Sequence, residues 1–135
     1  MQTNSSKGMI GEMKFAEMCY KMDYSVSKPM NDDNSYDFIV DTKARLIKVQ
    51  VKTIYLKSQE EGKEARWRLT LGKKKLERYK RDCDLLVIYI QPLDIWYIIP
   101  ADGLYDDSNT INIYPDSENS SGRFEPYKNK FDLII

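Results

Sequence analysis

The alternation of apolar and polar residues between positions 46 and 56 is the feature that most limits how this chain can fold. A period of two predicts a β-strand with one apolar face and one polar face. The apolar face carries Ile47, Val49 and Val51, and the polar face carries Lys48, Gln50 and Lys52. Residues 36–41 are also strand-like, and the segment 41–45 that joins the two is short enough for a hairpin turn. We therefore expect two neighbouring antiparallel strands.

The rest of the chain alternates between helical and extended patterns. Helical spacing of apolar residues runs from about residue 7 to residue 22, with Ser5 and Ser6 as capping residues, and a short second helix is expected over 73–81. Further strands are predicted over 65–71, 84–91, 95–99 and 110–114, of which 84–91, with its apolar run at 85–90, is the most hydrophobic. This order predicts an α/β sandwich with a mixed sheet. A chain of 135 residues has the size of one domain, spanning 1–135.

The chain has no histidine, which excludes several classes of enzyme. Ser-His-Asp and Cys-His triads, His-ligated zinc sites and histidine general bases all require that residue. Cys19 and Cys83 are too few for a disulfide scaffold and lack zinc-ribbon spacing. No apolar run reaches the ~20 residues that cross a bilayer, and the N-terminus carries no apolar signal core. We therefore expect a cytoplasmic protein with no membrane contact, whose chemistry uses carboxylates, Lys, Tyr, amides or a hard metal ion.

Polar side chains from three predicted elements can meet at one place. Gln50 and Lys52 point the same way, and the hairpin brings Asp37 beside them. Glu12 lies near the start of the first helix, in a Gly-x-x-Gly-Glu segment that begins at Gly8. Two carboxylates and an amide oxygen suit Mg²⁺, and the lysine would orient or help deprotonate a water and stabilise charge on a phosphate. The alternative is an ordinary surface strand, because the D-x12-Q-x-K spacing alone is weak evidence.

The ordered set of motifs resembles the PD-(D/E)XK nuclease superfamily. The residues that carry the resemblance are Glu12, Ser27-Lys28-Pro29, Tyr36-Asp37 and Val49-Gln50-Val51-Lys52-Thr53. The Q-x-K form together with a G-x-x-G-E helix is similar to the branch that contains intron-encoded homing endonucleases. The resemblance extends from about residue 7 to residue 133, through Tyr79, Asp84, Trp96 to Pro100, Ile113 to Pro115, Phe124 and Tyr127. It implies a restriction-endonuclease-like core, a central mixed sheet flanked by helices in the order αβββαβ.

The resemblance also implies roles for four residues. Asp37 matches the main metal ligand, Gln50 occupies the (D/E) position, Lys52 matches the catalytic lysine, and Glu12 matches the helix glutamate that completes or supports the metal site. The implied cofactor is Mg²⁺, with Mn²⁺ as a substitute, and the implied substrate is DNA. Gln50 is neutral where most relatives have an acid, so weaker metal affinity is expected.

Basic residues gather in the middle of the chain although the net charge is zero. Residues 61–90 hold nine basic and five acidic side chains, whereas residues 91–135 hold three and eight. The candidates for phosphate-backbone contact are Lys73, Lys74, Lys75, Arg78 and Arg81. A pI near 6.3 is unusual for a strong DNA binder, so charge alone favours a solvated helix face. The nuclease-like site makes DNA contact an equal alternative.

The sequence therefore predicts a metal-dependent DNA endonuclease, homing-endonuclease-like or Holliday-junction-resolvase-like. One alternative is a nucleic-acid-binding module with the same fold and weak or no activity, which Gln50 and the neutral net charge favour. Another is a protein-interaction domain of a mobile-element or viral protein. A chain of this size has little surface for a long DNA site, so a homodimer or homotetramer suits double-strand cutting.

Overall fold

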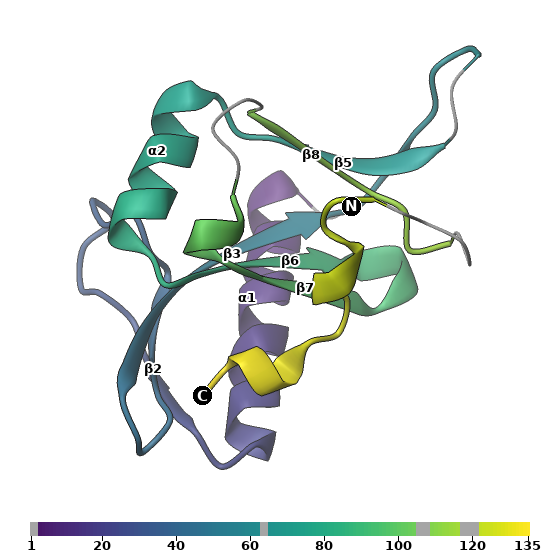
Figure 1. The fold of residues 1–135 in the computed structure, drawn as a ribbon. Coiled ribbons are helices and arrows are strands. Elements are labelled where there is room, and N and C mark those ends of the chain that lie inside the picture. The colour runs from purple at the N-terminus through teal and green to yellow at the C-terminus, as the bar shows by residue number, and fades with distance from the viewer. Residues whose placement is uncertain (1–2, 63–64, 105–108, 117–121) are drawn as a thin grey trace.

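The computed structural model describes residues 3–62, 65–104, 109–116 and 122–135, which form two α-helices, two sheets and short 3₁₀ turns (Figure 1). The main sheet contains β1 (Ser25–Ser27), β2 (Phe38–Asp41), β3 (Leu46–Ile54), β6 (Leu85–Ile90) and β7 (Ile95–Pro100). A smaller sheet contains β4 (Lys57–Ser58), β5 (Arg66–Thr70) and β8 (Thr110–Ile113). The helices are α1 (Asn4–Lys21) and α2 (Lys73–Asp82), and the 3₁₀ turns span Gln91–Leu93, Ala101–Gly103, Glu125–Tyr127 and Phe131–Leu133.

The main sheet is mixed, as the sequence predicts. Its strand order is β1-β2-β3-β6-β7. β3 and β6 are parallel, with Gln50 opposite Leu86, and every other neighbouring pair in this sheet is antiparallel. The parallel pair requires a crossover, and the segment between β3 and β6 supplies it with β4, β5 and α2. The elements that run from α1 to β6 therefore contain the expected αβββαβ core, and the small sheet is added to it.

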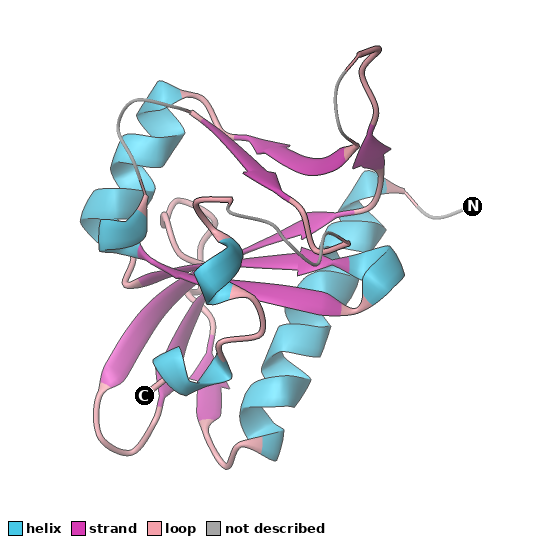
Figure 2. Cartoon of the chain, turned by 45° about the vertical axis from the view of Figure 1, so that its right-hand side comes forward, coloured by secondary structure: helices cyan, strands magenta, loops and turns pink. Residues whose placement is uncertain are grey.

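The two helices cover opposite faces of the main sheet. Phe15 and Cys19 of α1 pack with Val49 and Val51 of β3, the apolar face that the alternation predicts. Side chains of α2 and the small sheet pack on the other face of the main sheet. Ile54, the last residue of β3, lies on that face and packs with them. Figure 2 shows α2 and the small sheet together on one side of the main sheet and α1 on the other. Because β3 is central and covered on both faces, Gln50 is buried and Lys52 is partly buried, whereas Lys48, near the start of the strand, stays exposed.

Three details differ from the sequence-based expectations. The cap of α1 is Thr3, not Ser5 or Ser6, because the hydroxyl of Thr3 accepts the backbone N–H of Ser6 at 3.1 Å. β2 begins at Phe38, so Asp37 lies just before the strand rather than on it. The two-residue strand β4, which pairs with β5, is not among the strands that the sequence predicts.

Two further expectations concern the environment of the chain. Among the described residues, neither helix combines the length and the apolar character that a bilayer crossing requires. Cys19 and Cys83 are buried free thiols, and burial raises the pKa of each to about 12. Both therefore stay protonated and act as small apolar core residues rather than as nucleophiles.

Candidate functional site

The candidate site lies where β2 and β3 separate. β2 pairs with β3 only from Phe38 onward, and the backbone N–H of Asp37 still donates to the carbonyl of Val49 at 2.8 Å. The Asp37 carboxylate then accepts the next outward-facing N–H of β3, from Val51, at 2.9 Å. The side chain thus replaces the missing strand partner. The same hydrogen bond fixes Asp37 beside Gln50, at a point where the sheet leaves room for a ligand.

Gln50 and Lys52 project from β3 toward the face that α2 covers. Gln50 is 7% exposed, and its Nε2 donates weakly to the carbonyl of Val51 at 3.4 Å. This contact turns the amide oxygen, the atom able to bind a cation, away from that carbonyl. The ammonium of Lys52 lies 5.8 Å from the centre of the Tyr79 ring on α2, close enough for a cation–π contact. The ammonium group of Lys52 is therefore held against the C-terminal half of α2.

Glu12 reaches the site because α1 lies very close to β3. A Cβ atom added to Gly11 would stand 1.9 Å from the hydroxyl oxygen of Thr53, so only glycine permits this approach. Glu12 follows directly, and Lys28 holds its carboxylate with an Nζ to Oε1 distance of 3.2 Å. Lys28 also lies 5.2 Å from the centre of the Phe38 ring. The Gly-x-x-Gly-Glu segment thus sets the depth of the helix on the sheet.

Glu12, Asp37, Gln50 and Lys52 all line one cavity of about 270 Å³. Burial raises the pKa of Asp37, and the neighbouring Glu12 carboxylate raises it further. The N–H of Val51 and the ammonium groups of Lys52 and Lys28 oppose this rise without cancelling it. The structure therefore brings together the four residues that the sequence singled out, in a pocket whose carboxylates would gain from a nearby cation. Their catalytic roles stay predictions.

The predicted DNA-contacting residues lie on α2, where all five side chains are exposed. Burial raises the pKa of Tyr79, and the nearby charges of Lys75 and Arg78 act in the opposite direction without cancelling this rise. Because Lys52 contacts the same ring, the basic face of α2 borders the candidate site. Arg81 differs from the others in that its guanidinium binds the carboxylate of Asp82 at 2.8 Å. Contact of this face with DNA stays a prediction.

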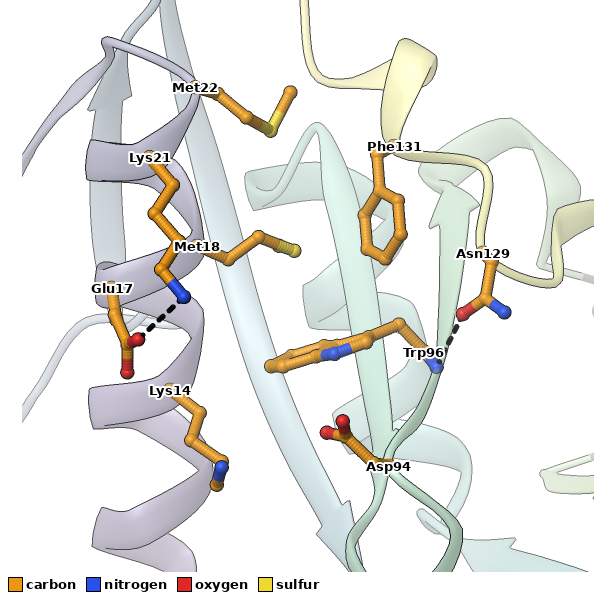
Figure 3. Close-up of a pocket in the computed structure, with 9 residues that line it drawn as sticks. All are labelled: Lys14, Glu17, Met18, Lys21, Met22, Asp94, Trp96, Asn129 and Phe131. Carbon is orange, nitrogen blue, oxygen red and sulfur yellow. Dashed lines mark hydrogen bonds and ion pairs between the residues drawn. The ribbon is translucent and has the colours of Figure 1, made fainter.

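Another cavity, of about 550 Å³, lies between the C-terminal half of α1 and the edge strand β7 (Figure 3). Its interior is apolar, formed by Met18, Met22, Trp96 and Phe131, and the Glu17–Lys21 ion pair lies on the helix beside it. None of the predicted site residues lines it. Its two carboxylates already have partners, since Glu17 pairs with Lys21 and Asp94 accepts the hydroxyl of Tyr89 at 2.7 Å.

Three residues of the site were not assigned a role from the sequence. Lys28 pairs with Glu12, Tyr79 contacts Lys52, and Thr53 contacts Gly11. Lys28 and Tyr79 lie within segments that carry the family resemblance, but their partners are 16 and 27 positions away. Spacing along the chain gives no signal for such contacts, which depend on how the helices pack on the sheet.

Comparisons with known proteins bear on the family and the fold of this chain. The profile of the PD-(D/E)XK endonuclease family matches residues 1–134. A solved structure of a bacterial homing endonuclease, I-Ssp6803I, is similar to this chain with a TM-score of 0.79 and 26% sequence identity. The alignment covers 99% of this chain and 92% of that one. A comparison with curated proteins found no match.

Proposed function

We propose that this chain, which belongs to the PD-(D/E)XK endonuclease family, is a divalent-metal-dependent endodeoxyribonuclease of the homing-endonuclease kind. The observation that carries the proposal is the convergence of Glu12, Asp37, Gln50 and Lys52 on one cavity. These residues come from α1, the position just before β2 and the middle of β3. The similar fold of a bacterial homing endonuclease supports DNA as the substrate.

The donor set fits a hard divalent cation. No group of three His, Cys, Asp or Glu side chains suited to a metal occurs among the described residues, so an all-carboxylate cage is not available in that part of the chain. Mg²⁺ does not need one, because it keeps several waters and is typically bound through one or two carboxylates and substrate phosphate oxygens. Asp37 and Glu12 would supply the carboxylates, and Gln50 the amide oxygen.

The chain's own residues would each do a separate task in phosphodiester hydrolysis. Bound Mg²⁺ would supply the positive charge that makes a water more acidic and offsets charge on the phosphate. Lys52, held against Tyr79, would orient the attacking water and stabilise the negative charge that develops in the transition state. The Val51 N–H fixes Asp37, and Lys28 fixes Glu12. Water attack in line with the leaving oxygen then cleaves the strand.

The surroundings of the site suggest how DNA would bind. The exposed basic face of α2, with residues 73–75 and Arg78, would contact the phosphate backbone beside the cavity. One copy offers one set of catalytic residues, so cutting both strands at one place would use a homodimer or homotetramer. Size-exclusion chromatography with light scattering would report the oligomeric state directly.

The test is incubation of the purified protein with plasmid, branched and single-stranded DNA, each in Mg²⁺, Mn²⁺ and EDTA. We expect cleavage of at least one DNA form with either metal and none in EDTA. The matched control is Asp37→Asn, which keeps the size of the side chain and an oxygen that can accept the Val51 N–H. Cleavage by this variant at the wild-type rate would refute the assignment of the site.

A second candidate function is a DNA-binding module with little or no catalysis. The observation that favours it is Gln50, a neutral and buried side chain at the position where an acid would strengthen metal binding. This alternative predicts salt-dependent DNA binding without cleavage in any metal. It also predicts that Mn²⁺ leaves the melting temperature unchanged, whereas a working site would raise it.

A further inference from the structure

A cavity different from those described above, also of about 550 Å³, opens directly beside the candidate active site. Glu12 and Asp37 line both this cavity and the active-site cavity, so any molecule held at these carboxylates has room to extend into it. The other walls come from the first turns of α1 and from the segment between β1 and β2. Its volume lies within the range of about 300–1,000 Å³ that is usual for small-ligand sites.

The segment between β1 and β2 lines this cavity with hydrogen-bonding side chains. Asn31 and Asn34 are exposed, and the Nδ2 of Asn34 donates to the Oδ1 of Asn31 at 2.6 Å. The contact holds both amides in place and leaves the NH₂ of Asn31 and the carbonyl of Asn34 for a ligand. A base edge such as that of adenine offers one acceptor and one donor, so it can bind one free donor and one free acceptor of this pair. The pair is thus suited to a nucleobase.

Lys28 contributes a basic side chain to the wall of this cavity. Its ammonium group is held by the Glu12 carboxylate at 3.2 Å and lies near the Phe38 ring. It therefore lies beside Glu12, which both cavities share. Asp32, on the same loop, also lines the cavity and is exposed. A phosphate would be attracted by Lys28 and repelled by Asp32. Together these two charges would orient a bound nucleotide.

We propose that this cavity is the subsite for the nucleotide next to the scissile phosphate. Lys28 contacts the phosphate of that nucleotide, and Asn31 and Asn34 contact its base. The inference rests on the proposed nuclease function, because the shared carboxylates Glu12 and Asp37 place the subsite beside the reacting phosphate. It assigns part of the sequence preference of the enzyme to a loop that lies outside the catalytic motif.

The experiment selects from a pool of random DNA duplexes, once for binding and once for cleavage in Mn²⁺. The wild type is compared with an Asn31→Ala/Asn34→Ala double variant and with Asp33→Ala. Asp33 is a matched control because it is exposed on the same loop and is not among the residues that line either cavity. We expect the double variant to lose about 5- to 150-fold of base discrimination at one or two positions beside the cut. Its Mn²⁺ affinity should be unchanged.

A Lys28→Met variant tests the phosphate contact separately. The affinity should fall by a similar factor for every DNA sequence. The slope of log affinity against log salt should flatten by about 0.9, the value for one lost phosphate contact. Lys28→Arg should restore the slope. A double alanine variant with wild-type sequence preference in both selections would overturn the subsite even if the wild type cleaves well.

The two proposals fail in different ways in these measurements. Binding preference that depends on Asn31 and Asn34, without cleavage by the wild type, would support the base contacts of these two residues and refute the nuclease function. Cleavage by the wild type, with a sequence preference that the double variant keeps, would support the nuclease function and refute the subsite. Absence of DNA binding by the wild type would overturn both.

Discussion

Replacing Gly11 with alanine tests whether close contact between α1 and β3 sets the position of Glu12. The added Cβ atom would lie 1.9 Å from the hydroxyl oxygen of Thr53, against about 3.5 Å for an ordinary contact. Either the helix moves out by about 1.5 Å or Thr53 changes rotamer, and a β-branched residue has little rotamer freedom. We expect the helix to move and to carry Glu12 away from Asp37.

The expected losses differ between stability and rate. Overpacking a core costs roughly 1–3 kcal/mol, and the higher helix propensity of alanine returns about 0.5–1 kcal/mol of that. The unfolding free energy should therefore fall by no more than about 2.5 kcal/mol. Cleavage should fall by about 10²-fold, because misplacement of an active-site group by ~1 Å is enough for that loss. Urea unfolding and single-turnover cleavage measure the two quantities.

Two variants serve as controls for this prediction. A Cβ atom added to Gly8, on the same helix, would stand 3.6 Å from the Tyr55 hydroxyl, an ordinary contact. Gly8→Ala should therefore be as stable as the wild type or slightly more stable. In a Gly11→Ala/Thr53→Ala variant the 1.9 Å contact disappears and the Cβ of Thr53 is left at 3.2 Å. The double variant should regain most of the lost rate. Wild-type cleavage by Gly11→Ala alone would refute the reasoning.

Three other predictions concern the cavity and the helix beside it. Burial raises the pKa of Asp37. Between the ordinary and the raised pKa, the folded chain therefore binds more protons than the unfolded chain. The stability of the metal-free protein consequently falls as the pH rises through that window. Asp37→Asn should remove this pH dependence and be at least as stable at neutral pH, yet show neither cleavage nor a Mn²⁺-induced rise in melting temperature; thermal unfolding from pH 3 to pH 8 checks it. Gln50→Glu should keep or strengthen Mn²⁺ binding because it adds a negative ligand, while Gln50→Leu should weaken it, and equal calorimetric affinities for Gln50→Leu and the wild type would exclude a ligand role. Lys52→Ala should slow single-turnover cleavage by about 10²–10⁴-fold with little change in DNA binding. A triple alanine variant at residues 73–75 should instead flatten the slope of log affinity against log salt by about 0.9 per lost contact and leave the cleavage rate at saturating DNA nearly unchanged. A triple variant with the wild-type slope would show that DNA does not contact this part of α2.

Local patterns in the sequence determined the central part of the fold. The alternation in residues 46–56 fixed the strand and its two faces, because adjacent side chains of an extended chain must point to opposite sides. The short 41–45 segment fixed the hairpin, and the apolar run at 85–90 became a strand that is buried throughout. These features follow from contacts between near neighbours, which composition and spacing encode directly.

The ordered motifs also indicated which polar residues would meet. Asp37, Gln50 and Lys52 lie on one hairpin, so the register of two strands is enough to bring them together. Glu12 was harder to place, since it comes from a helix, and the family resemblance supplied what periodicity does not. The start of β2 was predicted two residues too early, because Asp37 uses its side chain rather than its backbone to pair with Val51.

Only the tertiary structure decided what surrounds these four residues. The ion pair between Lys28 and Glu12 and the contact between Lys52 and Tyr79 join residues from different elements. They depend on how deeply α1 lies on the sheet and on which face the crossover places α2. The same packing makes Glu12 and Asp37 line two adjoining cavities. Such contacts join positions far apart in the chain, and their distances are set by the packing of whole elements, which no local pattern of residues specifies.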